Sequence, residues 1–523
     1  MTLGKCYTFA LEGVIAHIVE VQANIGPGLP GISVVGQPDT AITESRTRVR
    51  TAVANSTLAW PKTKIVVSMS PASLPKSGSH FDVPMAVAIL VAGRKGSNGL
   101  ENASEIHRRL ASTLFLGELG LDGTLRSVAG ALPALIAARQ AGFDSIVLPP
   151  GNSAEAKLAP DLTVYVAETL NDVFSWVCLQ RVLPLAGAYA EGAYGSAVAG
   201  KRTDSQALDF SDIAGQHDAK KAAEIAAAGG HHLMMIGPPG SGKSMVAARI
   251  PGILPRLDNK QAVAATAIHS LAGTVGKVVE IPPFIAPHAS ITRAALMGGG
   301  SGNPRPGAVS LAHHGVLFLD EVSETPAAVL DSLRAPLEEG EVRIARARRE
   351  ITYPARFQLI MAANPCRCAA EDPVSCRCSA TERQGYLRNI SGPLRDRLDM
   401  VVRLSGQAAI ICAEQEETSS AIADRVEQAR QRAARRWNKV GLAARTNAEI
   451  SPSYLRRHFP AEESAMAMLV AYLSTGQLSQ RGVDRCLKLA WTLSDLAGTS
   501  LPQIDHVGTA LEMRGAHQAA VAL

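Results

Sequence analysis

The stretch Met235-Ile-Gly-Pro-Pro-Gly-Ser-Gly-Lys-Ser244 has the spacing G-x-x-x-x-G-K-S, with an apolar run before it and a helix-forming run after it. In this pattern backbone N–H groups surround a phosphate, the lysine reaches the β- and γ-phosphate oxygens, and the serine binds Mg²⁺. The N-terminus of the following helix favours an anion. The sequence therefore predicts a strand–loop–helix unit that binds ATP or GTP with Mg²⁺. The predicted nucleotide contacts are Gly237, Pro238, Pro239, Gly240, Ser241, Gly242, Lys243 and Ser244.

A second motif, later in the chain, would complete such a site. Gly315-Val-Leu-Phe-Leu-Asp-Glu-Val322 reads as a buried strand of apolar residues followed by two acids. Asp320 is placed for the Mg²⁺ shell, and Glu321 is placed to polarise the attacking water. An acidic strand end alone is common, but after a P-loop in the same region it indicates nucleotide hydrolysis.

Length and composition limit the rest of the molecule. The 523 residues exceed a single core, so roughly two to four domains are expected. The net charge of +5 permits a nucleic-acid partner but does not argue for one. The first residues lack the pattern of a signal peptide, and the longest apolar stretch, Val83–Ala92, is too short to cross a bilayer. We expect a cytoplasmic protein without a membrane segment.

Changes in composition divide the chain. Residues 1–182 alternate strand-like and helix-like runs, and 183–208 contain a small-residue stretch that reads as a linker. The alternation typical of an α/β nucleotide domain covers 209–405, and 406–523 read as nearly all helical. The sequence therefore predicts a multidomain α/β protein with a helical C-terminal domain.

The paired nucleotide motifs resemble the AAA+ family, and two further segments resemble its magnesium-chelatase-like branch. Asn364, in Leu359-Ile-Met-Ala-Ala-Asn-Pro365, matches the sensor-1 residue of that branch, which would hydrogen-bond the attacking water or the γ-phosphate. Residues 288–315 resemble the helix-2 insertion of the branch. His313 and His314, inside that insertion, are expected to pack or hydrogen-bond rather than bind metal, because no acid or cysteine stands beside them.

The same resemblance assigns two arginines to the nucleotide. Arg397 matches the arginine finger, with Arg395 as its rival, and a finger implies a ring in which one subunit contacts the γ-phosphate of the next. Arg481 matches the sensor-2 arginine of the C-terminal helical lid. Arg485 is the alternative, one turn further along the same helical face.

Three arginines are candidates for DNA contact. Leu337–Tyr353 read as a hairpin whose tip carries Arg346, Arg348 and Arg349. In helicases resembling this branch the corresponding hairpin contacts DNA phosphates, a contribution that depends on salt. The alternative is a solvated turn.

Two other groups of arginines have plainer explanations. One group lies on a single helical face, which we expect to be exposed to solvent. The other occupies every second position of a segment that either contacts nucleic acid or lies on the solvated surface. The first group is Arg425, Arg432 and Arg436; the second is Arg46, Arg48 and Arg50.

Four cysteines lie close together just after the sensor-1 position. Their thiolates could close a tetrahedral Zn²⁺ site, and free thiols are the alternative because C-x-C is tighter than the usual C-x₂-C spacing. Members of the resembled family have a cysteine pair here, with Pro between the two cysteines and Gly after the second. This chain has Arg367 and Ala369 at those two positions. The cysteines are Cys366, Cys368, Cys376 and Cys378.

The N-terminal region resembles the Lon-type protease fold, also called ribosomal S5 domain 2-like. A working Lon site needs a serine activated by a lysine. The motifs place His80 at the serine position and Leu132 at the lysine position. Ser77 and Ser79 are nearby, but no lysine follows in the helical segment to activate them. We therefore expect a protease-inactive domain.

A Lon-like domain, a linker, an AAA+ module with a helix-2 insertion and a helical lid, in this order, resemble the ComM/YifB family. The resemblance implies a homo-hexameric ATPase that uses ATP and Mg²⁺ and binds branched or single-stranded DNA. In the ComM members it implies branch migration during recombination of incoming DNA. A protein-remodelling motor of the magnesium-chelatase type is the alternative, and an active ATP-dependent protease is disfavoured.

Overall fold

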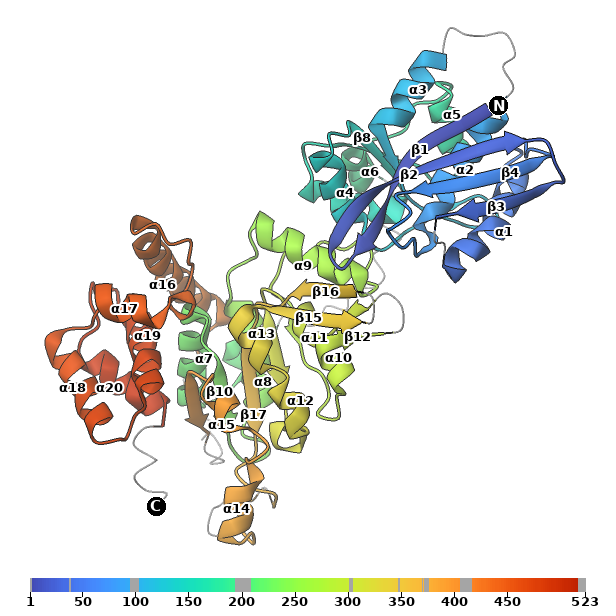
Figure 1. Cartoon of the computed structure of the whole chain (residues 1–523). Helices are drawn as coiled ribbons and strands as arrows, with labels where there is room; N and C mark the ends of the chain where they lie inside the picture. The colour runs from blue at the N-terminus through green and yellow to red at the C-terminus, as the bar shows by residue number, and fades with distance from the viewer. Residues whose placement is uncertain are drawn as a thin grey trace.

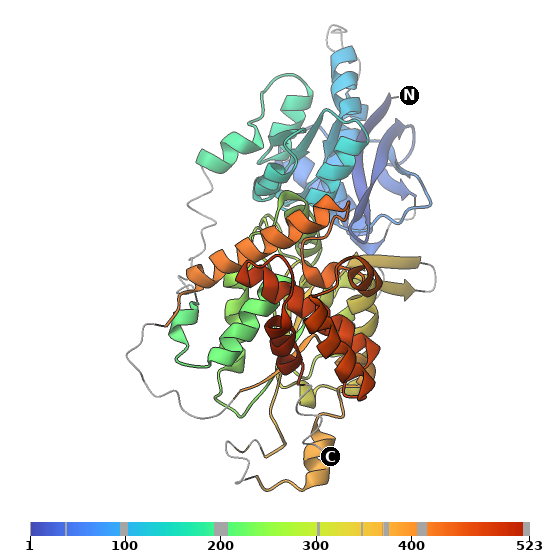
Figure 2. The same ribbon diagram turned by 90° about the vertical axis from the view of Figure 1, so that its left-hand side faces the viewer.

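The computed structural model describes residues 2–36, 39–94, 103–192, 208–300, 304–346, 349–368, 370, 376–404 and 416–515. An N-terminal α/β domain lies beside an α/β nucleotide domain, and a helical domain packs on the other side of the latter (Figures 1 and 2). The predicted multidomain α/β architecture is confirmed. Among the described residues, no helix combines the length and apolar character needed to cross a membrane.

The N-terminal domain is built on a seven-stranded mixed sheet in the order β3-β4-β2-β1-β5-β8-β9. Helix α2 is buried along almost its whole length because its sequence, DVPMAVAILVAG, is apolar on every face. The strands are β1 (Thr2–Glu12), β2 (Ile15–Gly26), β3 (Gly31–Val35), β4 (Lys64–Ser70), β5 (Thr113–Phe115), β8 (Ser145–Leu148) and β9 (Thr163–Val166), beside a hairpin of β6 (Glu118–Leu119) and β7 (Leu125–Arg126). The helices are α1 (Thr40–Asn55), η1 (Ser79–Phe81), α2 (Asp82–Gly93), α3 (Ala103–Ser112), α4 (Ala131–Gln140), η3 (Pro150–Leu158) and α5 (Leu170–Val177).

The first part of the expected linker over 183–208 differs from the expectation. Residues Ala186–Gly192 form helix α6. Ala186 and Tyr189 are buried against the N-terminal domain, and the Tyr189 hydroxyl donates a hydrogen bond to Glu168 at 2.6 Å. Alanine favours a helix, and Tyr189 attaches this helix to the N-terminal domain. Composition alone does not reveal that contact. Residues 193–207 lie outside the described ranges.

The nucleotide domain contains a five-stranded parallel sheet in the order β11-β14-β17-β10-β18. Strand β17 lies between the P-loop strand β10 and the acidic strand β14, and all four residues of β14 are buried, as in a sheet covered on both faces. The strands are β10 (Leu233–Ile236), β11 (Phe284–Ile285), β14 (Val316–Leu319), β17 (Gln358–Ala363) and β18 (Met400–Arg403). The helices are η4 (Phe210–Asp212), α7 (His217–Gly229), α8 (Lys243–Ile253), α9 (Asn259–Leu271), α10 (Arg293–Met297), α11 (Ala308–Leu311), η5 (Val322–Glu324), α12 (Ala327–Asp331), α13 (Arg334–Glu339), α14 (Ala380–Tyr386) and α15 (Gly392–Arg395).

Two small hairpins project from this sheet domain. The predicted insertion contains the pair β12 (Gly298–Gly299) and β13 (Arg305–Pro306), and the predicted arginine hairpin is β15 (Glu341–Arg346) paired with β16 (Arg349–Pro354). Helix α14, after the cysteines, protrudes at the end of the molecule away from the N-terminal domain (Figures 1 and 2).

The C-terminal part is helical, as expected, and shares a core with the nucleotide domain. Trp437 is fully buried and makes edge contacts with Phe459 and Trp491. The same apolar cluster continues into the alanine-rich α7 of the nucleotide domain. The helices are α16 (Ser419–Lys439), η7 (Asn447–Glu449), α17 (Pro452–His458), α18 (Glu463–Ser474), α19 (Gln480–Ala497) and α20 (Ile504–Met513).

The N-terminal domain contacts the nucleotide domain directly. The backbone N–H of Gly130 donates to the Ser270 hydroxyl at 3.0 Å, and Glu155 accepts from the N–H of Gly276 at 3.2 Å. The β1–β2 turn rests on β16 (Figure 1): a Cβ at Gly13 would lie 2.9 Å from a methyl carbon of Ile351.

Candidate nucleotide site and cysteine cluster

The P-loop joins β10 to α8, as predicted. Gly240 and Gly242 have φ angles of +77° and +80°, which glycine adopts without strain. Lys243 is the first residue of α8, and its Nζ donates to the carbonyl oxygens of Gly237 and Pro238, each at 2.7 Å. Burial lowers the pKa of Lys243. The ammonium is thus held inside the loop that a phosphate would enter.

Ser244 and Asp320, the two predicted Mg²⁺ ligands, are in direct contact. The Ser244 hydroxyl donates to Asp320 Oδ2 at 2.6 Å, and Asp320 Oδ1 accepts from the N–H of Glu321 at 2.9 Å. A hydroxyl and a carboxylate are hard oxygen ligands, so the pair fits Mg²⁺. Glu321 has a φ of +46°, an unfavourable value for a residue other than glycine, and such strain is concentrated at functional sites.

Asn364 directly follows β17 and lies at the same edge of the sheet as the two motifs. The carboxyl ends of parallel strands meet at one edge, where ligands of open α/β sheets bind. The N–H of Gly237 donates to the carbonyl of Ala363 at 3.1 Å, which joins the sensor-1 position to the P-loop. Asn364 therefore sits between the P-loop and the acidic pair.

The predicted arginines gather at the opposite edge. Arg397 precedes β18, whose first residue pairs with the first residue of β10, so the length of the strand separates Arg397 from the P-loop. Four extended residues span about 13 Å. Burial lowers the pKa of Arg397, as do the nearby charges of Arg481 and Arg485. The three cations therefore form one cluster, away from the P-loop of their own chain.

Each arginine of the cluster has an acidic partner. Arg397 is 12% exposed and pairs with Glu338 on α13. Arg481 is 70% exposed and donates to Asp396 at 2.9 Å. Its exposure leaves Arg481 accessible to a ligand, in contrast to Arg485, which is described next.

Arg485 is 23% exposed and donates at 2.5 Å to Asp399, whose side chain is 1% exposed. Burial opposes ionisation of Asp399, but Arg485 and His231 outweigh it and hold the pKa of this carboxyl well below its usual value. Arg395, the rival finger, is exposed and makes a long bond of 3.4 Å to the Leu387 carbonyl. Of the two sensor-2 candidates, Arg485 has the structural role and Arg481 is the accessible one.

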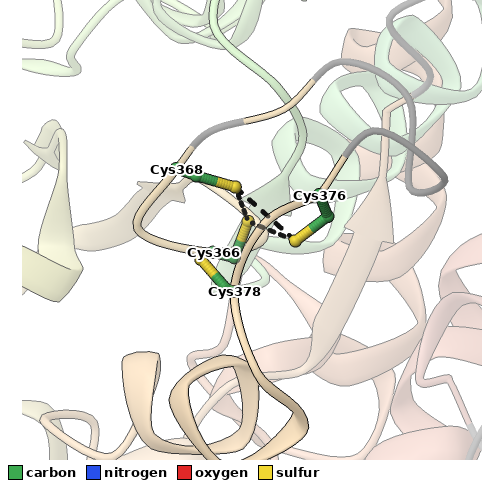
Figure 3. A group of neighbouring side chains, drawn as sticks. All are labelled: Cys366, Cys368, Cys376 and Cys378. Atoms are coloured by element: carbon green, nitrogen blue, oxygen red, sulfur yellow. Dashed lines mark hydrogen bonds between the residues drawn. The ribbon is translucent and has the colours of Figure 1, made fainter.

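The four cysteines after Asn364 converge on one point (Figure 3). Their sulfur atoms all lie within 4.8 Å of one another. Cys366 Sγ is 3.3 Å from Cys368 Sγ and 3.5 Å from Cys376 Sγ. A disulfide would need about 2.05 Å. Four thiolates around a tetrahedral Zn²⁺ at 2.3 Å stand about 3.8 Å apart, so the cluster, which includes Cys378, has nearly the spacing of a zinc site.

Among the described residues of the N-terminal domain, the positions that match the Lon serine and lysine hold His80 and Leu132. His80 is 5% exposed, stacks on Phe9 and bonds the Phe9 carbonyl at 2.9 Å, and burial lowers its pKa to about 4. Leu132 is fully buried. The Ser79 hydroxyl donates to Glu118. Lys76, the lysine nearest these serines in sequence, donates to the Pro71 carbonyl.

Comparison with known proteins places these features in one family. Three family models match: "Magnesium chelatase, subunit ChlI" over residues 209–410, "Subunit ChlI of Mg-chelatase" over 20–152, and "Magnesium chelatase, subunit ChlI C-terminal" over 416–514. Competence protein ComM of Haemophilus influenzae is 37% identical over 521 residues, covering 98% of both chains. The chain belongs to the ComM/YifB family.

Other relatives extend this assignment. An uncharacterised protein of Mycobacterium tuberculosis is 46% identical over 518 residues, 98% of this chain and 99% of that protein. Lon protease 2 of Bacillus subtilis is 32% identical over 141 residues, 25% of this chain and 26% of that protein. This ComM/YifB protein therefore combines the magnesium-chelatase-type AAA+ module with a segment similar to Lon.

The hairpin predicted to carry DNA-contacting arginines is present in this ComM/YifB protein. Arg346 and Arg349 are paired at the ends of β15 and β16, and Arg348 lies outside the described residues. The inner face of the hairpin is apolar, with Ile344 and Ile351 buried. The hairpin is thus anchored by its apolar face, and the Arg346–Arg349 pair ends its two strands.

One arginine in each of the two other groups forms an ion pair with a buried acid. Arg436 is 15% exposed, pairs with the buried Asp495 and lies over the Trp491 ring at 3.9 Å. Arg48 pairs with the buried Asp82 at 2.9 Å. Arg436 therefore does not lie on the solvated face that we expected, and Arg48 belongs to an internal ion pair, because in each case the acid partner comes from a distant part of the sequence. The expectation for His313 is confirmed: it is buried and accepts a bond from the N–H of Arg356 at 3.0 Å.

Sequence reasoning missed the acids that hold the arginine cluster. Asp396 and Asp399 stand in the segment Leu394-Arg-Asp-Arg-Leu-Asp399, directly before a strand. Their alternation with arginine was the available signal. Glu338, the partner of Arg397, is distant in sequence and gave none.

Proposed function

We propose that this protein is an ATP-driven, DNA-translocating motor of the helicase or branch-migration type that acts in DNA recombination or transformation. The observation that carries the proposal is the placement of Arg397 and Arg481 at the sheet edge opposite the P-loop of the same chain. Arginines there would complete a site only on a neighbouring subunit, as in a ring of identical chains. The name of the ComM relative, a competence protein, supports the link to DNA uptake.

The proposed hydrolytic step uses residues at the carboxyl edge of the sheet. Lys243 would exchange the carbonyls of Gly237 and Pro238 for the β- and γ-phosphate oxygens. Ser244 and Asp320 would hold Mg²⁺, which neutralises charge on the phosphates when bound. Glu321 would take a proton from the attacking water, and Asn364 would orient that water.

The proposed DNA contact is the hairpin tip. Arg346, Arg348 and Arg349 would bind phosphates, so DNA affinity should fall steeply with salt. The apolar packing of Ile344 and Ile351 supports this assignment, because it attaches the two strands of the hairpin to the core of the nucleotide domain.

The decisive experiment measures the ATPase rate with and without forked or four-way DNA, for the wild type and Glu321→Gln. Stimulation by DNA in the wild type, its loss in the variant and salt-dependent DNA binding are expected. If DNA leaves the ATPase rate unchanged and DNA binding does not depend on salt, the motor function is excluded. That result would favour a protein-remodelling ATPase of the magnesium-chelatase type, the activity that the family models' names suggest.

We also propose that the cysteine cluster binds Zn²⁺ as a structural ion. The convergence of Cys366, Cys368 and Cys376 at 3.3–3.5 Å supports it. Metal analysis of protein purified from zinc-replete medium should give one zinc per chain, and Cys376→Ser should remove it. Cys486→Ser, at a buried cysteine outside the cluster, is the control. Protein with no zinc would leave the thiols free.

A further inference from the structure

The lid contains a cavity of ≈ 380 Å³ at the C-terminal end of α16. Its volume falls within the range of about 300–1,000 Å³ that is usual for small-ligand pockets. Four basic side chains line it, together with one acid, one aromatic ring and two hydroxyl residues. The basic residues are Arg432, Arg435, Arg436 and Lys439.

The acid of this cavity, Asp495, is already neutralised. Its carboxylate is 2% exposed and pairs with Arg436, and it accepts from Asn447 Nδ2 at 2.9 Å. Its backbone carbonyl accepts from Arg432 at 2.5 Å. The remaining positive charge of the cavity therefore has no counter-charge in its lining.

The rim cations are available to a ligand. Arg435 and Lys439 are exposed, and within the described part of the chain neither makes an ion pair or a side-chain hydrogen bond. A helix C-terminus attracts cations, which accounts for Lys439 in the last turn. Arg432 and Arg435 lie before that turn, so the helix dipole does not explain them.

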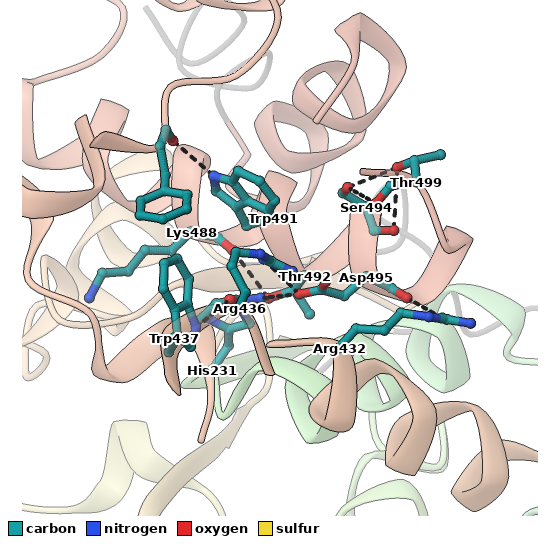
Figure 4. A network of polar contacts seen from close by, with 12 residues as sticks. His231, Arg432, Arg436, Trp437, Lys488, Trp491, Thr492, Ser494, Asp495 and Thr499 are labelled. Atoms are coloured by element: carbon teal, nitrogen blue, oxygen red, sulfur yellow. Dashed lines mark hydrogen bonds and ion pairs between the residues drawn. The ribbon is translucent and has the colours of Figure 1, made fainter. Parts of the chain in front are cut away.

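Ring contacts and hydrogen bonds hold the inner side of the cavity in place. The guanidinium of Arg436 lies 3.9 Å from the Trp491 ring centroid and 5.1 Å from that of Trp437. A chain of buried hydrogen bonds continues inward from Asp495 through Asn447 to Thr492. Figure 4 shows Asp495 and Thr492 beside Arg436. A preformed site costs less entropy on binding.

One wall is aromatic. Phe459 is half-buried, lines the cavity and packs edge-on against Trp437 and Trp491. An aromatic ring beside several arginines is the combination that binds nucleotides, with the base stacked on the ring and the phosphate on the cations.

We propose that this lid cavity binds a phosphate-bearing nucleotide unit, with the phosphate on Arg432, Arg435 and Lys439 and the base against Phe459. A strand of nucleic acid and a free nucleotide both present this chemistry. The site uses none of the P-loop or hairpin residues, so it stands or falls separately from the proposed function.

The test uses the full chain carrying Lys243→Ala, which disables the P-loop. Binding of fluorescent oligo(dT) and of a fluorescent ADP analogue is measured by anisotropy over a salt series. The probe variant is Arg435→Glu with Lys439→Glu, both at exposed positions. The control is Lys221→Glu with Lys260→Glu, the same charge change at exposed positions of α7 and α9.

We expect the probe variant to weaken binding of one ligand about tenfold or more, while the control does not. If the ligand is a strand, the salt slope should fall by about 1.4, because two phosphate contacts are lost. Phe459→Leu should weaken binding without changing that slope, in protein whose melting temperature is checked first. A loss confined to the ADP analogue would identify a free nucleotide. Equal binding of both ligands to probe and control would overturn the proposal.

Discussion

Arg485 on the lid donates a 2.5 Å hydrogen bond to Asp399, the residue directly before strand β18 of the nucleotide domain. Asp399 Oδ2 also accepts from the N–H of His232, which directly precedes β10. One buried carboxylate thus joins the lid to the starts of two neighbouring strands. A rotation of the lid relative to the sheet would have to break the bond between Arg485 and Asp399.

Arg485→Ala should therefore destabilise the protein, whereas Arg481→Ala should not. Removing one partner of a buried ion pair leaves an uncompensated charge and costs about 3–5 kcal/mol, while an exposed pair contributes about 0–1 kcal/mol. Thermal unfolding of both variants measures this. Arg481→Ala should lower the ATPase rate in a protein that melts like the wild type. Equal melting temperatures for the two variants would contradict the distinction.

Ser244→Ala should lower the ATPase rate by about a hundredfold or more and raise the Mg²⁺ concentration needed for half-maximal activity, because one of the two proposed ligands is lost. Ser244→Thr is the matched control, since P-loops use either hydroxyl. A Mg²⁺ titration of steady-state ATPase gives the result. An unchanged Mg²⁺ requirement in the alanine variant would remove Ser244 from the metal shell.

Mixing two inactive variants tests whether the arginine cluster acts on a neighbouring chain. Lys243→Ala lacks the P-loop lysine and Arg397→Ala lacks the finger, so each alone should be inactive. In mixed rings some interfaces combine an intact P-loop with an intact Arg397, and part of the ATPase activity should return. Arg395→Ala in place of Arg397→Ala is the control, and it should be active alone. Recovery absent at every mixing ratio, in mixtures shown to co-assemble, would argue against a shared site.

Acid should destabilise the nucleotide domain through His313. Burial lowers the pKa of His313 to about 3, with smaller contributions from the charges of His314 and Arg356. The folded state therefore favours the neutral ring: the stabilisation is fully present above the unfolded pKa of about 6.5 and is lost as the pH falls toward 3. At pH 5 the loss is about 2 kcal/mol.

His313→Asn should reduce this acid sensitivity, because the amide oxygen can accept the N–H of Arg356 without titrating. Melting temperatures between pH 7.5 and 5 measure it, with His288→Asn, at an exposed position, as the control. Parallel pH profiles for His313→Asn and the wild type would show that His313 does not contribute.

Gly13→Ala should impair DNA stimulation while leaving the basal ATPase rate unchanged. Gly13 has a φ of +60°, and a Cβ there would meet Ile351 at 2.9 Å and the carbonyl of Thr352 at 3.3 Å. The hairpin would have to shift, and with it the arginines at its tip. Gly26→Ala, where nothing lies within 4 Å of the added carbon, is the control. Equal DNA-stimulated ATPase rates in the two variants would show that the β1–β2 turn does not affect DNA stimulation.

Much of the nucleotide domain could be predicted from local sequence. The glycine spacing around Lys243 fixes a loop through backbone geometry, and four apolar residues before Asp320 form a strand buried on both faces. These features depend on neighbours in sequence. The order of the strands does not, and it is this order that places Asn364 between the two motifs.

The features that the sequence did not reveal share one cause. The partners of Arg436 and Arg48 are Asp495 and Asp82, 59 and 34 residues away in the chain, so helical periodicity could not reveal them. Helix α6 was not predicted because it depends on the packing of Ala186 and Tyr189 against the N-terminal domain, a contact between distant parts of the chain. Local sequence patterns predict helices and strands. Ion pairs between residues far apart in the chain decide which charged side chains remain exposed to solvent.

The contact of Gly13 with Ile351 has a mechanical consequence. The β1–β2 turn meets the hairpin, and the bond from Gly130 to Ser270 meets helix α9, so the N-terminal domain touches the nucleotide domain at two separate elements. Displacing the hairpin alone would change its position relative to the contact at helix α9. In the proposed motor, a movement of the hairpin during ATP turnover would therefore either carry the N-terminal domain along or break one of these contacts. In that proposal the Lon-like domain, which we expect to be protease-inactive, is part of the load that the motor moves.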